Sequence, residues 1–205
     1  DLSGNTGTTL GTGTDIVTSF PLLDTLQDNG GLVETHALLS GSPAIDAGNN
    51  TLATELTFDQ RCAPRIVGTA VDIGAFEDSL PIAFYDFQNS TFTVSEGNDA
   101  HTFSEVVINR TGNLSLATTV DVVLTGGDTT TAGLISVPFM PCQSSQVVPI
   151  EIRGNTIQEA NKTVALSLAN FSGSRWQLGT TQPTATLTIT DDDTTSPVDD
   201  TTPPV

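Results

Sequence analysis

Carboxylates are the residues of this chain with the greatest capacity for chemistry. The chain holds 24 Asp and Glu residues against six Lys and Arg residues, and its formal net charge is -18. Carboxylate oxygens are the ligands that hard cations such as Ca²⁺ prefer, and a solvated acidic surface is the plainer alternative. A charge of this sign repels the phosphates of nucleic acids and anionic membrane surfaces. The composition therefore predicts no nucleic acid partner and no membrane insertion.

Catalytic chemistry has few candidate residues. His36 and His101 lie in different predicted domains, and neither belongs to a recognisable nucleophile motif. A group of acids and arginines in residues 1–80 has the composition of an acid pair activated by arginine: Asp46, Asp59, Asp72, Glu77, Arg61 and Arg65. Ion pairs and turns that satisfy loop backbone explain this group better. The chain is therefore predicted not to be an enzyme, and a carbohydrate-acting enzyme that uses Asp46 or Asp72 is the weakest alternative.

The two cysteines, Cys62 and Cys142, are too far apart for a close-spaced metal motif. A disulfide in an oxidising compartment and two separate thiols both remain open, because the sequence carries no distance between them.

The elements that must position these side chains are strands. Thr, Gly, Ser, Asn and Val are abundant and turn formers recur every few positions, which favours short strands over helices. Residues 1–80 contain short apolar runs separated by turns, and residues 194–205 form a Pro, Thr and Asp-rich linker or tail. Residues 81–193 alternate apolar and polar positions in repeated short runs, which predicts an immunoglobulin-like sandwich of seven strands.

Two features of the sequence bear on where the protein acts. No apolar run is long enough to span a membrane, and the first residues, DLSGNTGTTL, lack the charged and apolar regions of a signal peptide. We therefore expect a mature or excised segment. We further expect the protein to be extracellular or located at the cell surface.

The stretch from Asp28 to Glu77 contains DNGGLVETHALLSGSPAIDAGNN, DQRCAPR and VDIGAFE. It resembles the closing segment of bacterial right-handed parallel β-helix surface proteins, the polymorphic outer-membrane-protein-like or choice-of-anchor group. The resemblance implies that residues 1–80 are the end, or solenoid cap, of a parallel β-helix.

The second half contains FTVSEGN at 92–98, TAG at 131–133, VPIEI at 148–152 and TATLTITDDD at 184–193. These pieces resemble the Calx-β module of sodium–calcium exchangers, integrins and bacterial adhesins. In calcium-binding members, carboxylates at one end of the sandwich form the site. The resemblance implies that the calcium ligands here are Glu96, Glu159, Asp191, Asp192 and Asp193.

The chain departs from that pattern where the family has an acidic turn. Gly154 and Asn155 replace acids, and Lys162 replaces a later Glu. Calcium takes six to eight oxygens, and its affinity falls as charged ligands are lost, so the pattern predicts a weak site or none. The adjacent aspartates repel one another unless a cation lies among them, and the ammonium of Lys162 is an alternative to calcium.

Two functional hypotheses follow, and both belong to an all-β protein. The first is a structural subunit of an extracellular fibre or an adhesin stalk, whose partners are other copies of itself, the upstream β-helix or neighbouring surface modules. The second is a calcium-binding adhesion module of a larger surface protein.

Overall fold

The computed structural model describes residues 20–78, 82–98, 101–127, 129, 133–172 and 176–194. The chain divides into two compact units. Unit 1 consists of Asp1–Ala83, Thr111–Ala117 and Met140–Gln143, and unit 2 consists of Phe84–Arg110, Thr118–Phe139 and Ser144–Val205. The predicted tail at 194–205 lies outside the described residues except for Thr194.

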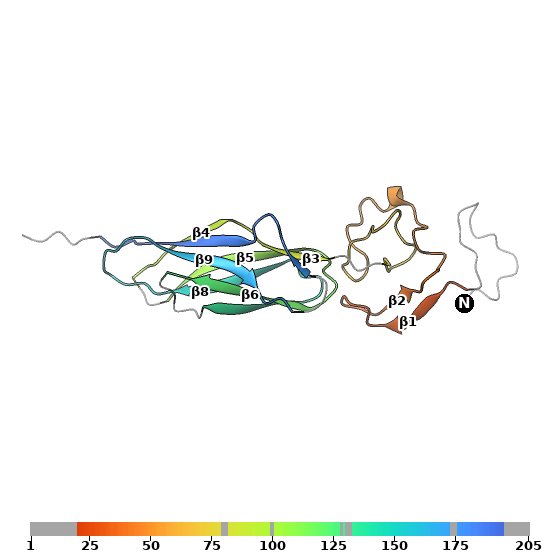
Figure 1. Cartoon of the computed structure of the whole chain (residues 1–205), viewed down its shortest axis with the longest axis horizontal. Helices are drawn as coiled ribbons and strands as arrows, with labels where there is room; N and C mark the ends of the chain where they lie inside the picture. The colour runs from red at the N-terminus through yellow and green to blue at the C-terminus, as the bar shows by residue number, and fades with distance from the viewer. Residues whose placement is uncertain are drawn as a thin grey trace, which may run out of the picture. The chain divides into compact units, whose positions relative to one another are not determined.

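Unit 2 is built on two β-sheets (Figure 1). The four-stranded sheet has the order β10-β3-β5-β8, and the five-stranded sheet has the order β4-β11-β9-β6-β7. The strands are β3 (Ala83–Phe87), β4 (Thr91–Ser95), β5 (Thr102–Gly112), β6 (Thr118–Thr125), β7 (Leu134–Phe139), β8 (Ser145–Ile152), β9 (Lys162–Ala169), β10 (Trp176–Leu178) and β11 (Thr184–Thr190).

Alternating burial along the strands confirms the predicted all-β sandwich. In β6 the side chains of Val120, Val122 and Leu124 are buried, and in β11 those of Leu187 and Ile189 are buried. Successive side chains of a strand point to opposite faces, so each strand gives one face to the core. Full burial of each such side chain contributes roughly 1.5–3 kcal/mol.

The described sheets have four and five strands, which is more than the seven strands predicted for the sandwich. The short edge strand β10 has no buried side chain. It therefore has no apolar alternation that a sequence pattern would reveal.

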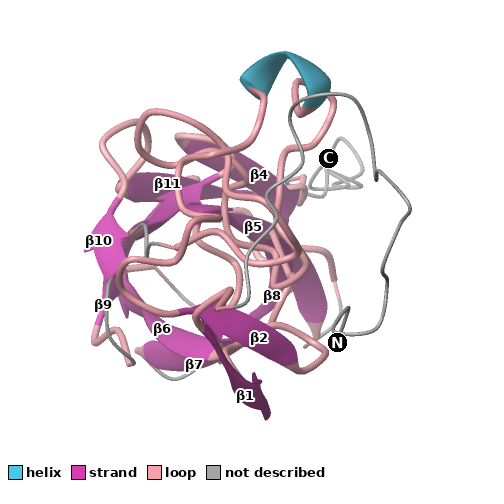
Figure 2. Cartoon of the chain, turned by 90° about the vertical axis from the view of Figure 1, so that its right-hand side faces the viewer, coloured by secondary structure: helices cyan, strands magenta, loops and turns pink. Residues whose placement is uncertain are grey.

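The described part of unit 1 is mostly loop (Figure 2). It contains the antiparallel pair β1 (Leu23–Gln27) and β2 (Thr35–Leu38), and a 3₁₀ turn at Asn50–Leu52. No parallel strand pair occurs among the described residues of unit 1, so the expected cap of a parallel β-helix is not shown. Turn-forming residues interrupt the apolar runs too often for long ladders, and side chains bond the loop backbone instead.

Buried charged side chains organise these loops. The Asp59 carboxylate accepts from Arg61 Nε (2.9 Å), from Arg61 Nη2 (2.7 Å) and from the backbone N–H of Ala63 (3.0 Å). The Arg61 guanidinium also lies 3.6 Å from the centroid of the Phe76 ring. The Glu77 carboxylate accepts from the backbone N–H groups of Val67 and Asp72, at 2.9 and 3.0 Å. These contacts are the ion pairs and turn-stabilising bonds that the sequence predicts for this group.

A disulfide joins Cys62 and Cys142, whose Cα atoms are 5.2 Å apart. Both cysteines belong to unit 1, although Cys142 lies in the connection between β7 and β8. The structure therefore decides between the two alternatives that the sequence left open.

Candidate cation site

The parallel pairing of β4 and β11 brings two acidic residues together at one end of the five-stranded sheet. The last aligned pair is Ser95 and Thr190, so Glu96 and Asp191 are the next residue on each strand. The backbone N–H of Glu96 donates to the carbonyl oxygen of Thr190 at 3.0 Å. Because the two strands run in the same direction, both acids leave the sheet at the same end.

The antiparallel pairing of β9 with β11 places a third segment at this end. Lys162, the first residue of β9, is aligned with Ile189 near the end of β11. The loop before β9 carries Asn161, whose Oδ1 accepts from the backbone N–H of Asp191 at 3.1 Å. The β8–β9 connection therefore lies beside the acidic residues.

Three carboxylates converge at this point. One oxygen from each of Glu96, Asp191 and Asp193 lies within 4.8 Å of the other two. Glu96 is only 2% exposed. Asp191 Oδ1 and Asp193 Oδ2 are buried and have no hydrogen-bond partner. Buried carboxylate oxygens cost free energy unless they are protonated, hydrogen-bonded or bound to a cation, so these two atoms are candidate ligand atoms.

Two amides complete the immediate surroundings. Asn155 Nδ2 donates to Glu96 Oε1 at 3.4 Å. In the orientation that satisfies its neighbours, the Asn98 amide nitrogen donates to Asp193 Oδ1 at 2.9 Å and to the Asn155 carbonyl oxygen at 3.2 Å. Asn98 was not predicted as a site residue, although it lies two positions after Glu96 in the same FTVSEGN motif.

The electrostatics of the site disfavour the ionised form of its carboxyl groups. Burial raises the pKa of Glu96, and a hydrogen bond with Asp191 raises it further, while the charge of Lys162 lowers it. Burial also raises the pKa of Asp193, with further contributions from the charges of Asp191, Asp192 and Glu159. Like charges in a partly desolvated place disfavour ionisation, and a bound cation relieves both effects.

The structure separates the five predicted ligands into two sets. Glu96, Asp191 and Asp193 converge. Asp192 is exposed and is not in that group. The Glu159 carboxylate accepts from Lys162 Nζ in an ion pair. Whether any of the five binds a metal stays a prediction.

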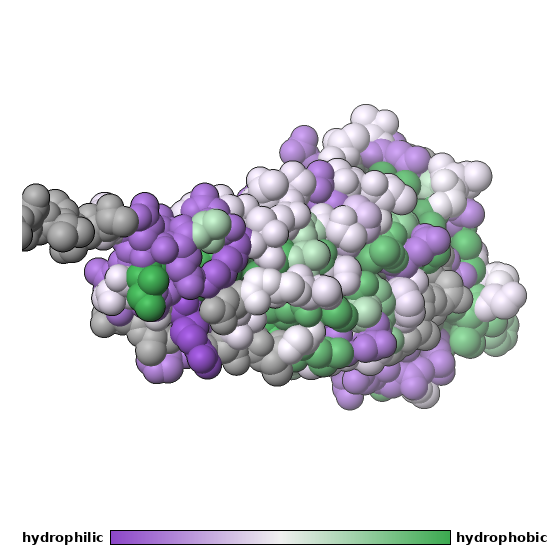
Figure 3. All heavy atoms as spheres, turned by 60° about the vertical axis from the view of Figure 1, so that its left-hand side comes forward, coloured by the Kyte–Doolittle hydropathy of each residue, from purple (hydrophilic) through white to green (hydrophobic). Residues whose placement is uncertain are grey.

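The arrangement is suited to a hard cation. It offers three carboxylates, and this group contains no thiolate or imidazole. Calcium prefers such an all-oxygen set, whereas transition metals favour sites with nitrogen or sulfur. Figure 3 shows hydrophilic side chains gathered at this end of unit 2, where the chain leaves β11.

The histidines make ordinary contacts. The Nδ1 atom of His36 is 2.6 Å from the Asp24 carbonyl oxygen, and that of His101 contacts the Glu151 carboxylate on the surface. Neither contact includes a nucleophile.

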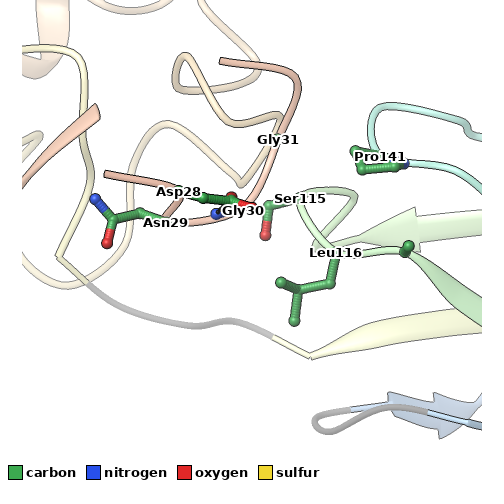
Figure 4. A pocket seen from close by; sticks show the side chains of 8 residues that line it. Asp28, Asn29, Gly30, Gly31, Ser115, Leu116 and Pro141 are labelled. Carbon is green, nitrogen blue, oxygen red and sulfur yellow. Dashed lines mark hydrogen bonds between the residues drawn. The ribbon is translucent and has the colours of Figure 1, made fainter. Parts of the chain in front are cut away.

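A pocket in unit 1 offers little chemistry (Figure 4). Its one acidic lining residue, Asp28, accepts from the backbone N–H of Gly30 at 2.9 Å through Oδ1. Its other lining residues are Asn29, Gly30, Gly31, Ser115, Leu116, Ala117 and Pro141. The pocket therefore lacks a general acid–base pair.

The described residues include no helix that is long and apolar enough to cross a membrane.

No protein-family model matches this chain, and no curated protein matches it. Among solved structures, the chain is similar to the apo form of the Calx CBD1 domain, with 25% identity over 55% of this chain and 99% of that one, at a TM-score of 0.46. It is also similar to CBD12 from CALX1.2, with 26% identity over 54% of this chain and 46% of that one, at a TM-score of 0.45. A third similar structure is the calcium binding domain CBD12 of CALX1.1, with 27% identity over 53% of this chain and 46% of that one, at a TM-score of 0.44. These TM-scores are below 0.5, so the residues of this chain must carry any functional conclusion.

Proposed function

We propose that this chain is a calcium-binding module of an extracellular or cell-surface protein, with its site at Glu96, Asp191 and Asp193. The module has no catalytic role. This function was the second hypothesis from the sequence, and the geometry favours it over the fibre subunit.

The observation that carries the proposal is the pair of buried, unpartnered oxygens, Asp191 Oδ1 and Asp193 Oδ2, beside buried Glu96. Exposed acidic residues need no ligand, because water solvates them. Buried carboxylates that face one another need a counter-charge, and a divalent cation supplies it at the point where their oxygens converge.

The expected affinity is low. Calcium takes six to eight oxygens, and three convergent carboxylates leave part of that shell to water. Extracellular calcium modules bind with dissociation constants of about 10⁻⁴–10⁻³ M, and we place this site in that range.

The disulfide supports a location outside the cytosol. Cys62 and Cys142 are bonded, and structural disulfides persist in oxidising compartments. The proposed partners are other copies of the chain or neighbouring modules of the same surface protein.

Thermal unfolding with and without calcium tests the proposal. A ligand that binds only the folded state at ten times its dissociation constant stabilises that state by about 1.4 kcal/mol. We therefore expect a rise of a few degrees in the melting temperature of unit 2 when a chelator is replaced by 10 mM CaCl₂.

Glu96→Gln removes one convergent charge and keeps the shape of the side chain, so we expect it to lose most of this rise. Glu105→Gln makes the same change on the exposed face of β5 and should behave like the wild type. Equal melting temperatures of the wild type in calcium and in chelator would contradict the proposal.

A further inference from the structure

Lys162 is the only lysine in the chain, and it lies at the acidic site. It is the first residue of β9 and is aligned with Ile189 of β11, two positions before Asp191. Its Nζ donates to Glu159 Oε2 in an ion pair, with 28% of the Lys162 side chain and 37% of the Glu159 side chain exposed. The only lysine side chain is therefore held near the end of the sheet where Glu96 and Asp191 leave it.

The field of this ammonium reaches the buried carboxylate. The charge of Lys162 favours the ionised form of Glu96, while the charges of Asp191 and Glu159 oppose it. Glu159 also acts on Asp193 from the same loop. The charge of Lys162 thus acts on Glu96, one of the carboxylates on which the calcium proposal rests, and its ion-pair partner Glu159 acts on both Glu96 and Asp193.

We propose that Lys162 is a tethered counter-ion of the acidic site, which a divalent cation displaces when it binds. This inference rests on the proposed calcium site and concerns its regulation. Without a bound divalent cation, the ammonium offsets part of the repulsion among the carboxylates. A bound divalent cation repels the ammonium, so the Lys162 side chain moves toward solvent and its ion pair with Glu159 breaks.

The exchange has two consequences for binding. The ammonium must be displaced, so it lowers the affinity for calcium in the native chain. Release of the ion pair also frees the Glu159 carboxylate, which then adds negative charge to the occupied site. Lys162 therefore sets the calcium concentration at which the site fills.

Substitution of Lys162 tests the first consequence. We expect Lys162→Gln to tighten calcium binding by roughly tenfold in titration calorimetry, as for a single and a double positive charge separated by about 6 Å in a high dielectric. Lys162→Arg is the matched control, because it keeps the positive charge at the same position of β9. An equal gain in both variants would overturn the role given to the charge of Lys162.

A double-mutant cycle tests the pairing with Glu159. If Lys162 acts through the ion pair, Lys162→Gln should change calcium affinity much less in the Glu159→Gln background than in the wild type. Equal changes in both backgrounds would overturn the role given to Glu159.

The displacement itself is visible in the intact chain because Lys162 is the only lysine. Reductive ¹³C-methylation labels its amine together with the chain's α-amine and keeps the positive charge. We expect the dimethyl-lysine resonance to shift on addition of calcium, with the midpoint that calorimetry gives. Calcium binding without a change at this resonance would overturn the counter-ion proposal and leave the calcium site intact.

Two further outcomes separate the proposals. Binding by Lys162→Gln but not by the wild type would support the counter-ion and overturn calcium binding by the native chain. An absence of binding by both proteins would overturn both proposals.

Discussion

At the scale of single residues, the same side-chain type has different roles in the two units. In unit 1 the carboxylates of Asp59 and Glu77 accept several backbone N–H groups and are paired with arginines. In unit 2 the oxygens of Asp191 and Asp193 include two buried atoms without partners. Satisfied carboxylates hold the loops of unit 1 together, whereas the proposed cation site of unit 2 contains unsatisfied ones.

Asp46 gives a pH-dependent prediction at this scale. Its Oδ1 accepts from the backbone N–H groups of Ala70 (3.0 Å) and Thr69 (3.1 Å), and these bonds lower the pKa of the carboxyl group. A pKa that is lower in the folded state stabilises the fold above the unfolded value of about 3.9, and this stabilisation is lost as the pH falls through the folded value.

We therefore expect Asp46→Asn to have a lower free energy of unfolding than the wild type at pH 7. This gap in unfolding free energy should narrow as the pH falls from 5 to 3. Asn tolerates the positive φ of 52° at this position, so the variant tests the charge rather than the backbone. Denaturant unfolding at several pH values measures the gap, with Glu105→Gln as the control for loss of one charge. A gap that stays constant or widens toward pH 3 would refute the assignment.

At the scale of elements, loops from the sandwich complete unit 1. The backbone N–H of Leu114, between β5 and β6, donates to the Cys62 carbonyl oxygen at 3.1 Å. The backbone N–H of Cys142, between β7 and β8, donates to the Leu114 carbonyl oxygen at 2.8 Å. Unit 1 is therefore discontinuous in sequence, and its folding requires strand connections from the second half of the chain.

The disulfide gives the prediction at this scale. It joins residues that are 80 positions apart, and removal of a native disulfide from a small domain costs roughly 2–5 kcal/mol. We expect the double variant Cys62→Ser with Cys142→Ser to lose stability in this range in denaturant unfolding. Reductant should lower the stability of the wild type and leave the double variant unchanged. Equal stability of the wild type with and without reductant would contradict this expectation.

At the scale of the whole molecule, unit 1 exposes large apolar side chains to solvent. Leu26 is 54% exposed and Leu32 is 71% exposed. Leu23, Leu26 and Ile73 line a pocket together with Leu38 and Phe76. Exposed apolar groups of this kind often mark interaction surfaces.

The docking of copies through unit 1, which the fibre hypothesis requires, stays a prediction. It expects sedimentation coefficients to rise with protein concentration, and Leu26→Asp to reduce this association because a charge there opposes burial. Measurements in chelator and in calcium separate this association from the cation site. Monomers at every concentration in both conditions would contradict the docking hypothesis and leave the calcium module unaffected.

The sequence by itself determined the sandwich. The alternation at Val120, Val122 and Leu124 is a local pattern, and period-two burial follows from strand geometry whatever the neighbouring strand is. The expected parallel β-helix has no such local periodicity to support it, and the described residues of unit 1 form an antiparallel pair and loops. The sequence also predicted that the acids of unit 1 stabilise its loops, because short loops leave backbone groups that Asp and Arg satisfy.

The side chains that meet at the candidate site are set by how distant segments pack together. Glu96 and Asp191 are neighbours because β4 and β11 pair in parallel at one particular register. Asp191 and Asp193 converge with Glu96 while exposed Asp192 does not, although the sequence presents three equivalent aspartates. Cys62 and Cys142 are bonded because the connection between β7 and β8, which carries Cys142, belongs to unit 1. Each of these contacts depends on strand order and register, which arise from packing between distant segments and leave no local pattern in the sequence.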